Sequence, residues 1–172
     1  DEDADLTGYY DGRADITLHR TLKADMHNTV VLPCDLTLWE SQYFFGEGTK
    51  IENIVAYEDG VLKTEPITDD TDFAPANKPF LLIPTSVNDD NIYTLHDVPV
   101  REGDLTDATF TCGKMVGSYA ATCDIAKSTE SGKENYVISN DQFYVINAPP
   151  ATMKGTRAYL VLDTPSNGVK SI

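Results

Sequence analysis

Turn-forming residues interrupt this chain at short intervals, and this spacing limits the possible folds more than any other feature. Clusters of Gly, Pro, Asn and Asp separate about ten apolar or alternating runs, with a turn signal every 8 to 12 residues or so. Runs of this length are typical of strands. The sequence therefore predicts an all-β fold, an antiparallel β-sandwich or open barrel of about ten short strands. No repeat of fixed period is visible, which disfavours a solenoid or a propeller.

Several turns are specific enough to predict hairpins. Asp-Gly at 59–60 suits the positive φ angles of a tight turn. Asn-Asp at 140–141 and Gly-Lys at 113–114 separate further apolar runs. A continuous apolar run at 80–83 lies between two prolines and predicts a strand that is buried on both faces.

Residues 16–22 and 29–32 form the predicted opening hairpin. Alternation in the first run places Leu18 and Arg20 on the same face, and Pro33 ends the second run because proline has no N–H to donate. An inward-facing Arg20 must be held by a carboxylate or by backbone carbonyls. Anion binding is the alternative role for this arginine.

One short helix is expected over residues 38–45. Thr37 and Glu40 have the spacing of a capping box, in which hydroxyl and carboxylate satisfy free backbone N–H groups reciprocally. Gly46 can adopt the left-handed conformation that ends the helix. Because a short helix is stable only when it packs, we expect its aromatic side chains in the core rather than on a ligand platform.

The charge balance restricts the partners of the chain. Among 172 residues, 28 Asp and Glu outnumber 13 Lys and Arg, which gives a formal net charge of -15. Such a field repels phosphate backbones, so nucleic acid is not an expected partner. No apolar run has the length of a membrane helix, which is about 20 residues. We interpret residues 1–14 as an acidic linker or edge segment and residues 15–172 as a single domain; the opening DEDADLTG, without Met, predicts a mature form or fragment.

The chain has three cysteines, Cys34, Cys112 and Cys123, and no CxxC pair. Neither a zinc ribbon nor a thioredoxin motif is therefore available. Cys112 and Cys123 could face each other across a hairpin and form a disulfide. The favoured interpretation is that all three are small buried hydrophobic residues.

No catalytic motif is present, and the three histidines do not have metal-ligand spacing, so we expect a protein that is not an enzyme. Tyr9 and Tyr10, on a predicted loop, are candidates for stacking on a sugar. Asp69, Asp70 and Asp72 are candidates to bind calcium, which takes oxygen ligands. Ordinary surface tyrosines and solvated carboxylates are the alternative interpretation.

Five motifs in order resemble a module that recurs in secreted and cell-surface proteins of gut and oral Bacteroidetes. Its pattern is approximately R-T-[IL]-K-A-x-x-W-N-T-[LI]-x-L-P-F, and RTLKADMHNTVVLPC at residues 20–34 is similar to it. Four further segments resemble later motifs of the module: residues 45–50 (module pattern F-G-x-G-T-K), 76–84 (A-G-K-P-Y-L-I-K-P), 117–119 (G-x-Y) and 157–159 (R-A-Y). His27 stands where the pattern has Trp, and Cys34 where it has Phe, so the local core must be repacked.

The resemblance implies a β-rich module, extracellular or on the cell surface, attached to neighbouring domains of a larger exported chain. It supplies no catalytic residues. We therefore expect a non-catalytic accessory domain with a structural or adhesive role, whose partners are those neighbouring domains and a glycan or host surface protein. The alternative is a carbohydrate-binding module, with calcium as a possible aid.

Overall fold

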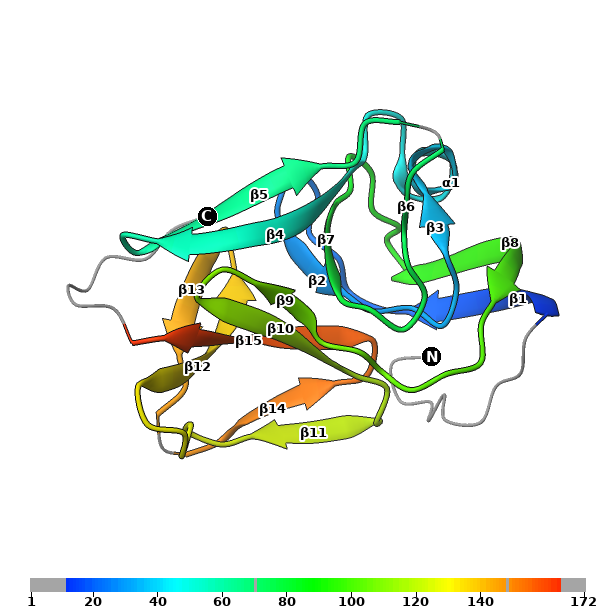
Figure 1. The fold of residues 1–172 in the computed structure, drawn as a ribbon. Coiled ribbons are helices and arrows are strands. Elements are labelled where there is room, and N and C mark those ends of the chain that lie inside the picture. Colours follow the sequence, from blue (N-terminus) through cyan, green and yellow to red (C-terminus); the bar gives the residue numbers. More distant parts are fainter. Residues whose placement is uncertain (1–11, 70, 148, 165–172) are drawn as a thin grey trace.

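The computed structural model describes residues 12–69, 71–147 and 149–164 (Figure 1). In these residues it consists of β-strands and one helix. The first part of the chain forms β1 (Gly12–His19), β2 (Asn28–Val30), β3 (Leu36–Thr37), α1 (Leu38–Phe45), β4 (Lys50–Glu58), β5 (Val61–Pro66), β6 (Phe73–Ala74), β7 (Phe80–Ile83) and β8 (Ile92–Val100). The second part forms β9 (Ala108–Phe110), β10 (Gly113–Ser118), β11 (Thr122–Ile125), β12 (Lys133–Ser139), β13 (Gln142–Val145), β14 (Ala151–Lys154) and β15 (Arg157–Asp163).

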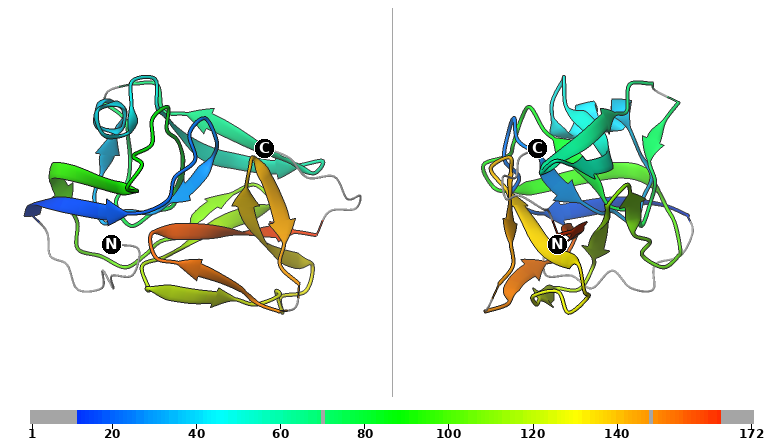
Figure 2. Two further views of the ribbon diagram at one scale, coloured as in Figure 1. Left: turned by 180° about the vertical axis from the view of Figure 1, so that it is seen from behind. Right: turned by 60° about the vertical axis from the view of Figure 1, so that its left-hand side comes forward.

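Two larger sheets and three strand pairs make up the fold (Figures 1 and 2). The four-stranded sheet has the order β2-β7-β4-β5, and the five-stranded sheet has the order β13-β12-β15-β10-β9. The pairs are β1-β8, β3-β6 and β11-β14. All of these ladders are antiparallel, so the predicted all-β sandwich class is confirmed.

The four-stranded sheet lies between two hydrophobic cores, because the side chains of a strand alternate between faces. In β7, Phe80 and Leu82 pack in a first core with residues of β1, β8 and α1. Leu81 points the other way and joins a second core with Met115 and Leu160 of the five-stranded sheet. The prediction that residues 80–83 form a strand buried on both faces is confirmed.

A third, smaller cluster covers the opposite side of the five-stranded sheet. Ile125 and Met153 of the β11-β14 pair pack there against Val137 and Tyr159. The fold is thus a stack of layers in which each apolar face is covered by the next layer.

Two predicted hairpin turns are confirmed by their backbone angles. Asp59 and Gly60 connect β4 to β5 with φ of 51° and 82°, and Asn140 and Asp141 connect β12 to β13 with φ of 53° and 56°. The third hairpin forms between β9 and β10, with its turn at Thr111 and Cys112, immediately before the predicted position. β11 pairs with β14 and not with β10.

The predicted opening hairpin is wrong. β1 pairs with β8, so that Leu18 lies opposite Tyr93, and β2 pairs with β7. Alternation along residues 16–19 assigns faces correctly, with Leu18 buried and His19 exposed, but it contains no information about the partner strand. β1 also begins at Gly12, three residues before the predicted domain boundary at 15.

Arg20 is buried, with 1% of its surface exposed. Its guanidinium donates hydrogen bonds to the carbonyl oxygens of Thr156, at 2.5 Å, and Thr29. The backbone N–H of Val31 also donates to the Thr156 carbonyl. The prediction that backbone carbonyls hold this arginine is confirmed, and the contacts join the first part of the chain to the β14-β15 turn.

All three cysteines are free, so Cys112 and Cys123 are not bridged. Cys34 is buried, and this burial raises the pKa of its thiol to about 12. Cys123 is half-buried, but Cys112 is exposed. The expectation of three buried thiols is therefore wrong for Cys112, which occupies a surface turn with φ of 65°.

Candidate binding site along helix α1

Helix α1 is fixed at both ends by side-chain contacts, and its predicted bounds are confirmed. At the start, the Thr37 hydroxyl accepts from the backbone N–H of Glu40 at 3.2 Å, while the Glu40 carboxylate accepts from the N–H of Thr37 at 2.9 Å. At the end, the Phe45 carbonyl accepts from the Thr49 hydroxyl and from the backbone N–H of Ser86. These contacts hold a helix of only eight residues in one position.

Two aromatic side chains of α1 point to solvent. Trp39 is 62% exposed and Tyr43 is 69% exposed, whereas Phe45 is buried in the first core. The rings of Trp39 and Tyr43 stack with centroids 5.6 Å apart and planes 14° apart. The expectation that the helix aromatics enter the core is therefore wrong for Trp39 and Tyr43, which we call the aromatic pair.

Helical geometry explains the exposed position of the aromatic pair. Successive residues are about 100° apart around the axis, so the stripe that carries Ser41 and Phe45 occupies a different arc from Trp39 and Tyr43. Ser41 and Phe45 are the buried residues of α1. A helix that packs on one side cannot also bury rings on another. A helical wheel of residues 38–45 separates these two arcs, but residue type alone does not show that the arc of Ser41 and Phe45 is the buried one.

A groove of about 420 Å³ runs beside the helix, between α1, the start of β4 and the end of β5. Its lining residues include Leu38, Gln42, Lys50, Glu52, Ile67 and Thr68. Leu38 and Gln42 each immediately precede a member of the aromatic pair. The groove, which we call the α1 groove, and the aromatic pair therefore occupy adjacent stripes of one helix.

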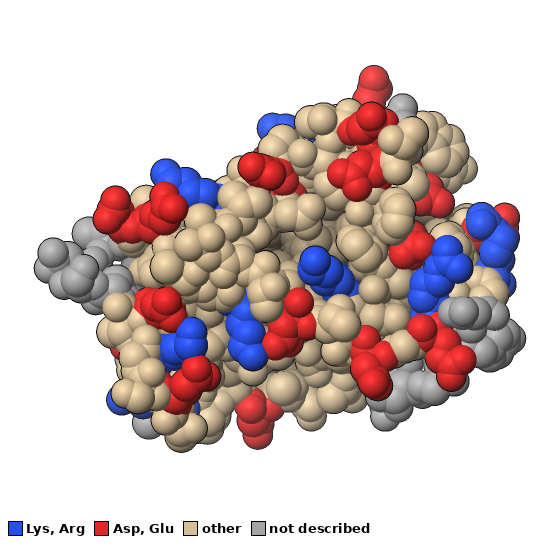
Figure 3. Space-filling model, viewed as in Figure 1, with Lys and Arg blue, Asp and Glu red and all other residues tan. Residues whose placement is uncertain are grey.

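Acidic residues lie within or next to the chain segments that line this groove. Glu52 lines the α1 groove, and the exposed residues Glu47, Glu65 and Asp69 are sequence neighbours of lining residues. We call these four carboxylates the acidic rim. On the face shown in Figure 3, acidic side chains also predominate over the upper part of the molecule, where α1, β3 and β6 lie.

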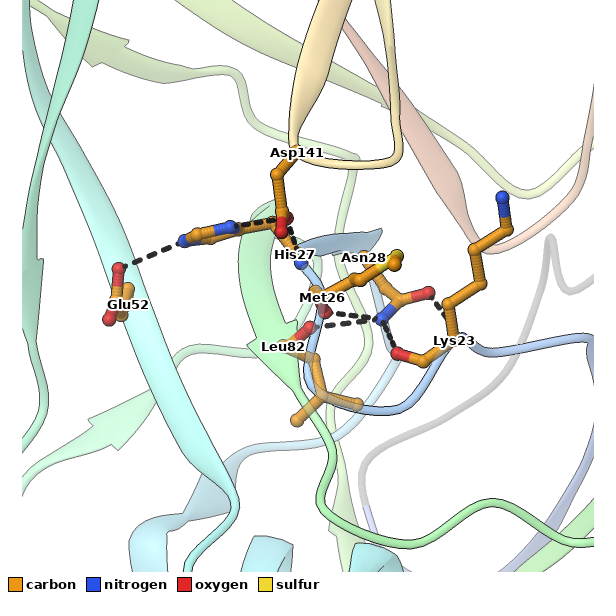
Figure 4. A network of polar contacts seen from close by, with 7 residues as sticks. All are labelled: Lys23, Met26, His27, Asn28, Glu52, Leu82 and Asp141. Carbon is orange, nitrogen blue, oxygen red and sulfur yellow. Dashed lines mark hydrogen bonds and ion pairs between the residues drawn. The ribbon is translucent and has the colours of Figure 1, made fainter. Parts of the chain in front are cut away.

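Glu52 connects the groove to a polar network centred on His27 (Figure 4). The imidazole Nε2 lies 3.5 Å from the Glu52 carboxylate, and Nδ1 lies 2.8 Å from the Asp141 carboxylate. The same Asp141 oxygen accepts from the backbone N–H of His27 at 2.8 Å. His27 thus lies between β4 and the turn of the β12-β13 hairpin.

Asn28 holds the loop that carries His27. Its amide donates to the carbonyls of Lys23 and Met26, and its side-chain oxygen accepts from the N–H of Lys23. These bonds close the loop on itself before β2 begins, so His27 is presented by an ordered backbone.

The His27 contacts alter the acidity of Asp141. Partial burial acts to raise the pKa of this carboxyl, but the hydrogen bonds from the His27 backbone and ring outweigh it, and the pKa is lowered from its usual value. Because carboxylates approach both ring nitrogens, the geometry is suited to joining two parts of the fold. Residues 27, 52 and 141 have no sequence spacing that would reveal this network.

The predicted sugar-stacking residues Tyr9 and Tyr10, and the predicted calcium ligand Asp70, lie outside the described residues. Asp69 accepts hydrogen bonds from the backbone N–H and hydroxyl of Thr71, which lower its pKa. Asp72 accepts from the N–H of Phe73. Within the described ranges, no group of three or more His, Cys, Asp or Glu residues is arranged to hold a metal ion. Calcium binding stays a prediction.

In the part of the chain that the structure describes, no helix has both the length and the apolar character needed to cross a membrane. The chain matches no protein-family model, no curated protein and no solved structure. The resemblance to the Bacteroidetes module accordingly stays a prediction from its five motifs.

Proposed function

We propose that this chain is a non-catalytic accessory domain of an exported bacterial surface protein, with a structural or adhesive role. The observation that supports an adhesive role is the aromatic pair, since Trp39 and Tyr43 are 62% and 69% exposed while Phe45 of the same helix is buried. Exposed tryptophan and tyrosine are the side chains that most often supply binding energy at contact surfaces.

The helix that carries the aromatic pair is well suited to present it. The capping box and the contacts of Thr49 and Ser86 fix both helix ends, and Phe45 anchors α1 in the first core. A binding surface on a fixed element loses less conformational entropy when its partner binds. Neighbouring domains of the parent chain would place this surface away from the cell envelope.

Adhesion of coated beads tests this proposal. Beads carrying the 172-residue chain are expected to bind cultured epithelial cells, and beads carrying Trp39→Ala are expected to lose most of that binding. Tyr144→Ala is the matched control, because Tyr144 is 48% exposed on β13, far from α1 in Figure 1. Equal binding by all three proteins, or hydrolysis of a polysaccharide panel by the isolated chain, would contradict the proposal.

A carbohydrate-binding module is the second candidate, and the α1 groove favours it. The groove has a volume of about 420 Å³, within the range of small-ligand sites, and lies beside two rings that can stack on a sugar. A glycan array probed with calcium and again with chelator tests this candidate. Binding to a glycan that is lost in chelator would support the prediction that calcium assists binding, and binding that persists in chelator would contradict it.

A further inference from the structure

We infer that the aromatic pair and the α1 groove bind an uncharged glycan chain, and that the acidic rim excludes sulfated and uronic glycans. This inference rests on the carbohydrate-binding candidate above and assigns its ligand class. Four features of the site support it: the geometry of the two rings, the polar groups of the groove, the charge around both, and the size of the site.

The rings provide the stacking surface. Their planes differ by 14° and their centroids are 5.6 Å apart, so Trp39 and Tyr43 stack on each other and leave their outward-facing ring surfaces exposed on the outside of α1. The apolar face of a pyranose ring packs on such a surface while its hydroxyls stay in water. The contact between the two rings restricts their side-chain rotamers, which reduces the entropy lost on binding.

The groove provides hydrogen-bonding groups beside this surface. Gln42 and Thr68 offer an amide and a hydroxyl, while Leu38 and Ile67 form apolar parts of the wall. The Glu52 carboxylate lies 3.5 Å from the His27 ring and its side chain is only 13% exposed. A mainly apolar wall with a few polar groups is typical of small-ligand sites. One sugar of a chain can lie on the rings while the next enters the groove.

The charge of the site selects among glycans. Among the described residues that line the groove, Lys50 is the only cation and Glu52 the only carboxylate, and the exposed residues Glu47, Glu65 and Asp69 adjoin lining residues in the sequence. The whole chain adds a net charge of -15. A sulfated or uronic chain would bring further negative charge into this field, which is unfavourable at short range.

The size of the site favours a glycan over a protein partner. Aromatic side chains bury roughly 150–250 Å² each, so the two rings at their exposed fractions offer about 200–300 Å². A stable protein interface covers about 800 Å² on each partner. The aromatic pair with its groove matches a few sugar rings more closely than a protein surface.

The experiment uses affinity electrophoresis of the full 172-residue chain in gels that contain mannan, starch or a β-glucan. Retardation by at least one of these uncharged polysaccharides is expected, and Trp39→Ala is expected to weaken it about tenfold, as loss of a stacking contact does. Tyr144→Ala again serves as the control. Circular dichroism verifies that each variant folds, which is expected because both side chains are largely exposed.

The charge selection is tested with the bound polysaccharide before and after partial sulfation. Sulfation is expected to weaken binding at least tenfold at low salt, and Glu47→Gln with Glu65→Gln is expected to recover part of the loss. Stronger binding of the sulfated form, no uncharged ligand, or unchanged binding by Trp39→Ala would overturn the inference. If bead adhesion still depends on Trp39 but is abolished by protease treatment of the cells, the ligand is a protein: the inference then fails while the adhesive function stands.

Discussion

Arg20 places a guanidinium group between two segments that are far apart in the chain. It donates to the carbonyls of Thr29 and Thr156, and the Thr156 carbonyl also accepts from the N–H of Val31. Burial of a cation is costly, and hydrogen bonds of this kind replace its hydration.

We expect Arg20→Met to lower the free energy of unfolding by about 2–4 kcal/mol, because it removes the guanidinium hydrogen bonds to the buried carbonyls of Thr29 and Thr156. Urea denaturation measures the difference. Arg13→Met is the control, since Arg13 forms an exposed ion pair with Asp97, and such pairs contribute little to stability. A loss for Arg20→Met no larger than that of the control would contradict the assigned role.

The lowered pKa of Asp141 predicts how the free energy of unfolding depends on pH. The folded state favours the ionised carboxylate, so its contribution to stability is present above the unfolded pKa, near 4, and is lost as pH falls through the lower folded pKa. Asp141→Asn should therefore be less stable than the wild type at pH 6, and the difference should shrink below pH 4 or so.

Unfolding curves of both proteins between these pH values provide the measurement. Asp104→Asn, in an exposed loop, is the matched control for loss of one negative charge. The same pH profile in both variants would show that general charge repulsion, rather than the contact between Asp141 and His27, causes the loss of stability at low pH.

At the scale of elements, local chemistry made the turns and the helix predictable. The sequence predicts the turns at Asp59-Gly60 and Asn140-Asp141 because few residues accept positive φ. It predicts the helix start at Thr37 because a capping box needs only a suitable acceptor three residues later, here Glu40. The β1-β8 pairing was missed because its partner strand lies more than 70 residues later in the sequence and pairing leaves no local mark.

The candidate site was less predictable than the fold. The exposure of Trp39 and Tyr43 depends on which arc of α1 meets the first core, and short-helix stability alone predicted the opposite. His27, Glu52 and Asp141 come from three separate elements, so only the folded chain brings them together. The residues chosen from sequence for binding, Tyr9 and Tyr10, lie outside the described ranges.

The helix cap supplies a prediction for α1. Thr37→Ala should lower the free energy of unfolding by about 1 kcal/mol, because it leaves the N–H of Glu40 without its acceptor. Thermal unfolding measures the change against Thr129→Ala, at an exposed loop position. Equal melting temperatures for the two variants would contradict the contribution of the cap.

At the scale of the whole molecule, β7 belongs to two cores at once. Leu81 faces the second core and Leu82 the first, and both are fully buried. Loss of packing on one face of the four-stranded sheet therefore affects the strand that supports the other face.

We expect Leu81→Ala and Leu82→Ala each to cost about 2–5 kcal/mol, and each variant to unfold in one transition. Tryptophan fluorescence reports on the first core through Trp39 on α1, and far-ultraviolet circular dichroism reports on all strands. Midpoints that separate between the two probes in either variant would show that the cores unfold independently.

The second core also has a consequence for the order in which the chain is assembled. Its members come from β4, β5 and β7 on one side and from β10, β12, β13 and β15 on the other, with the break between them in the exposed stretch at residues 101–107. A cut at that stretch would leave each piece with an apolar sheet face that the other piece covers in the intact chain. The two parts of the chain, before and after this stretch, are therefore expected to reassociate when they are produced as separate fragments.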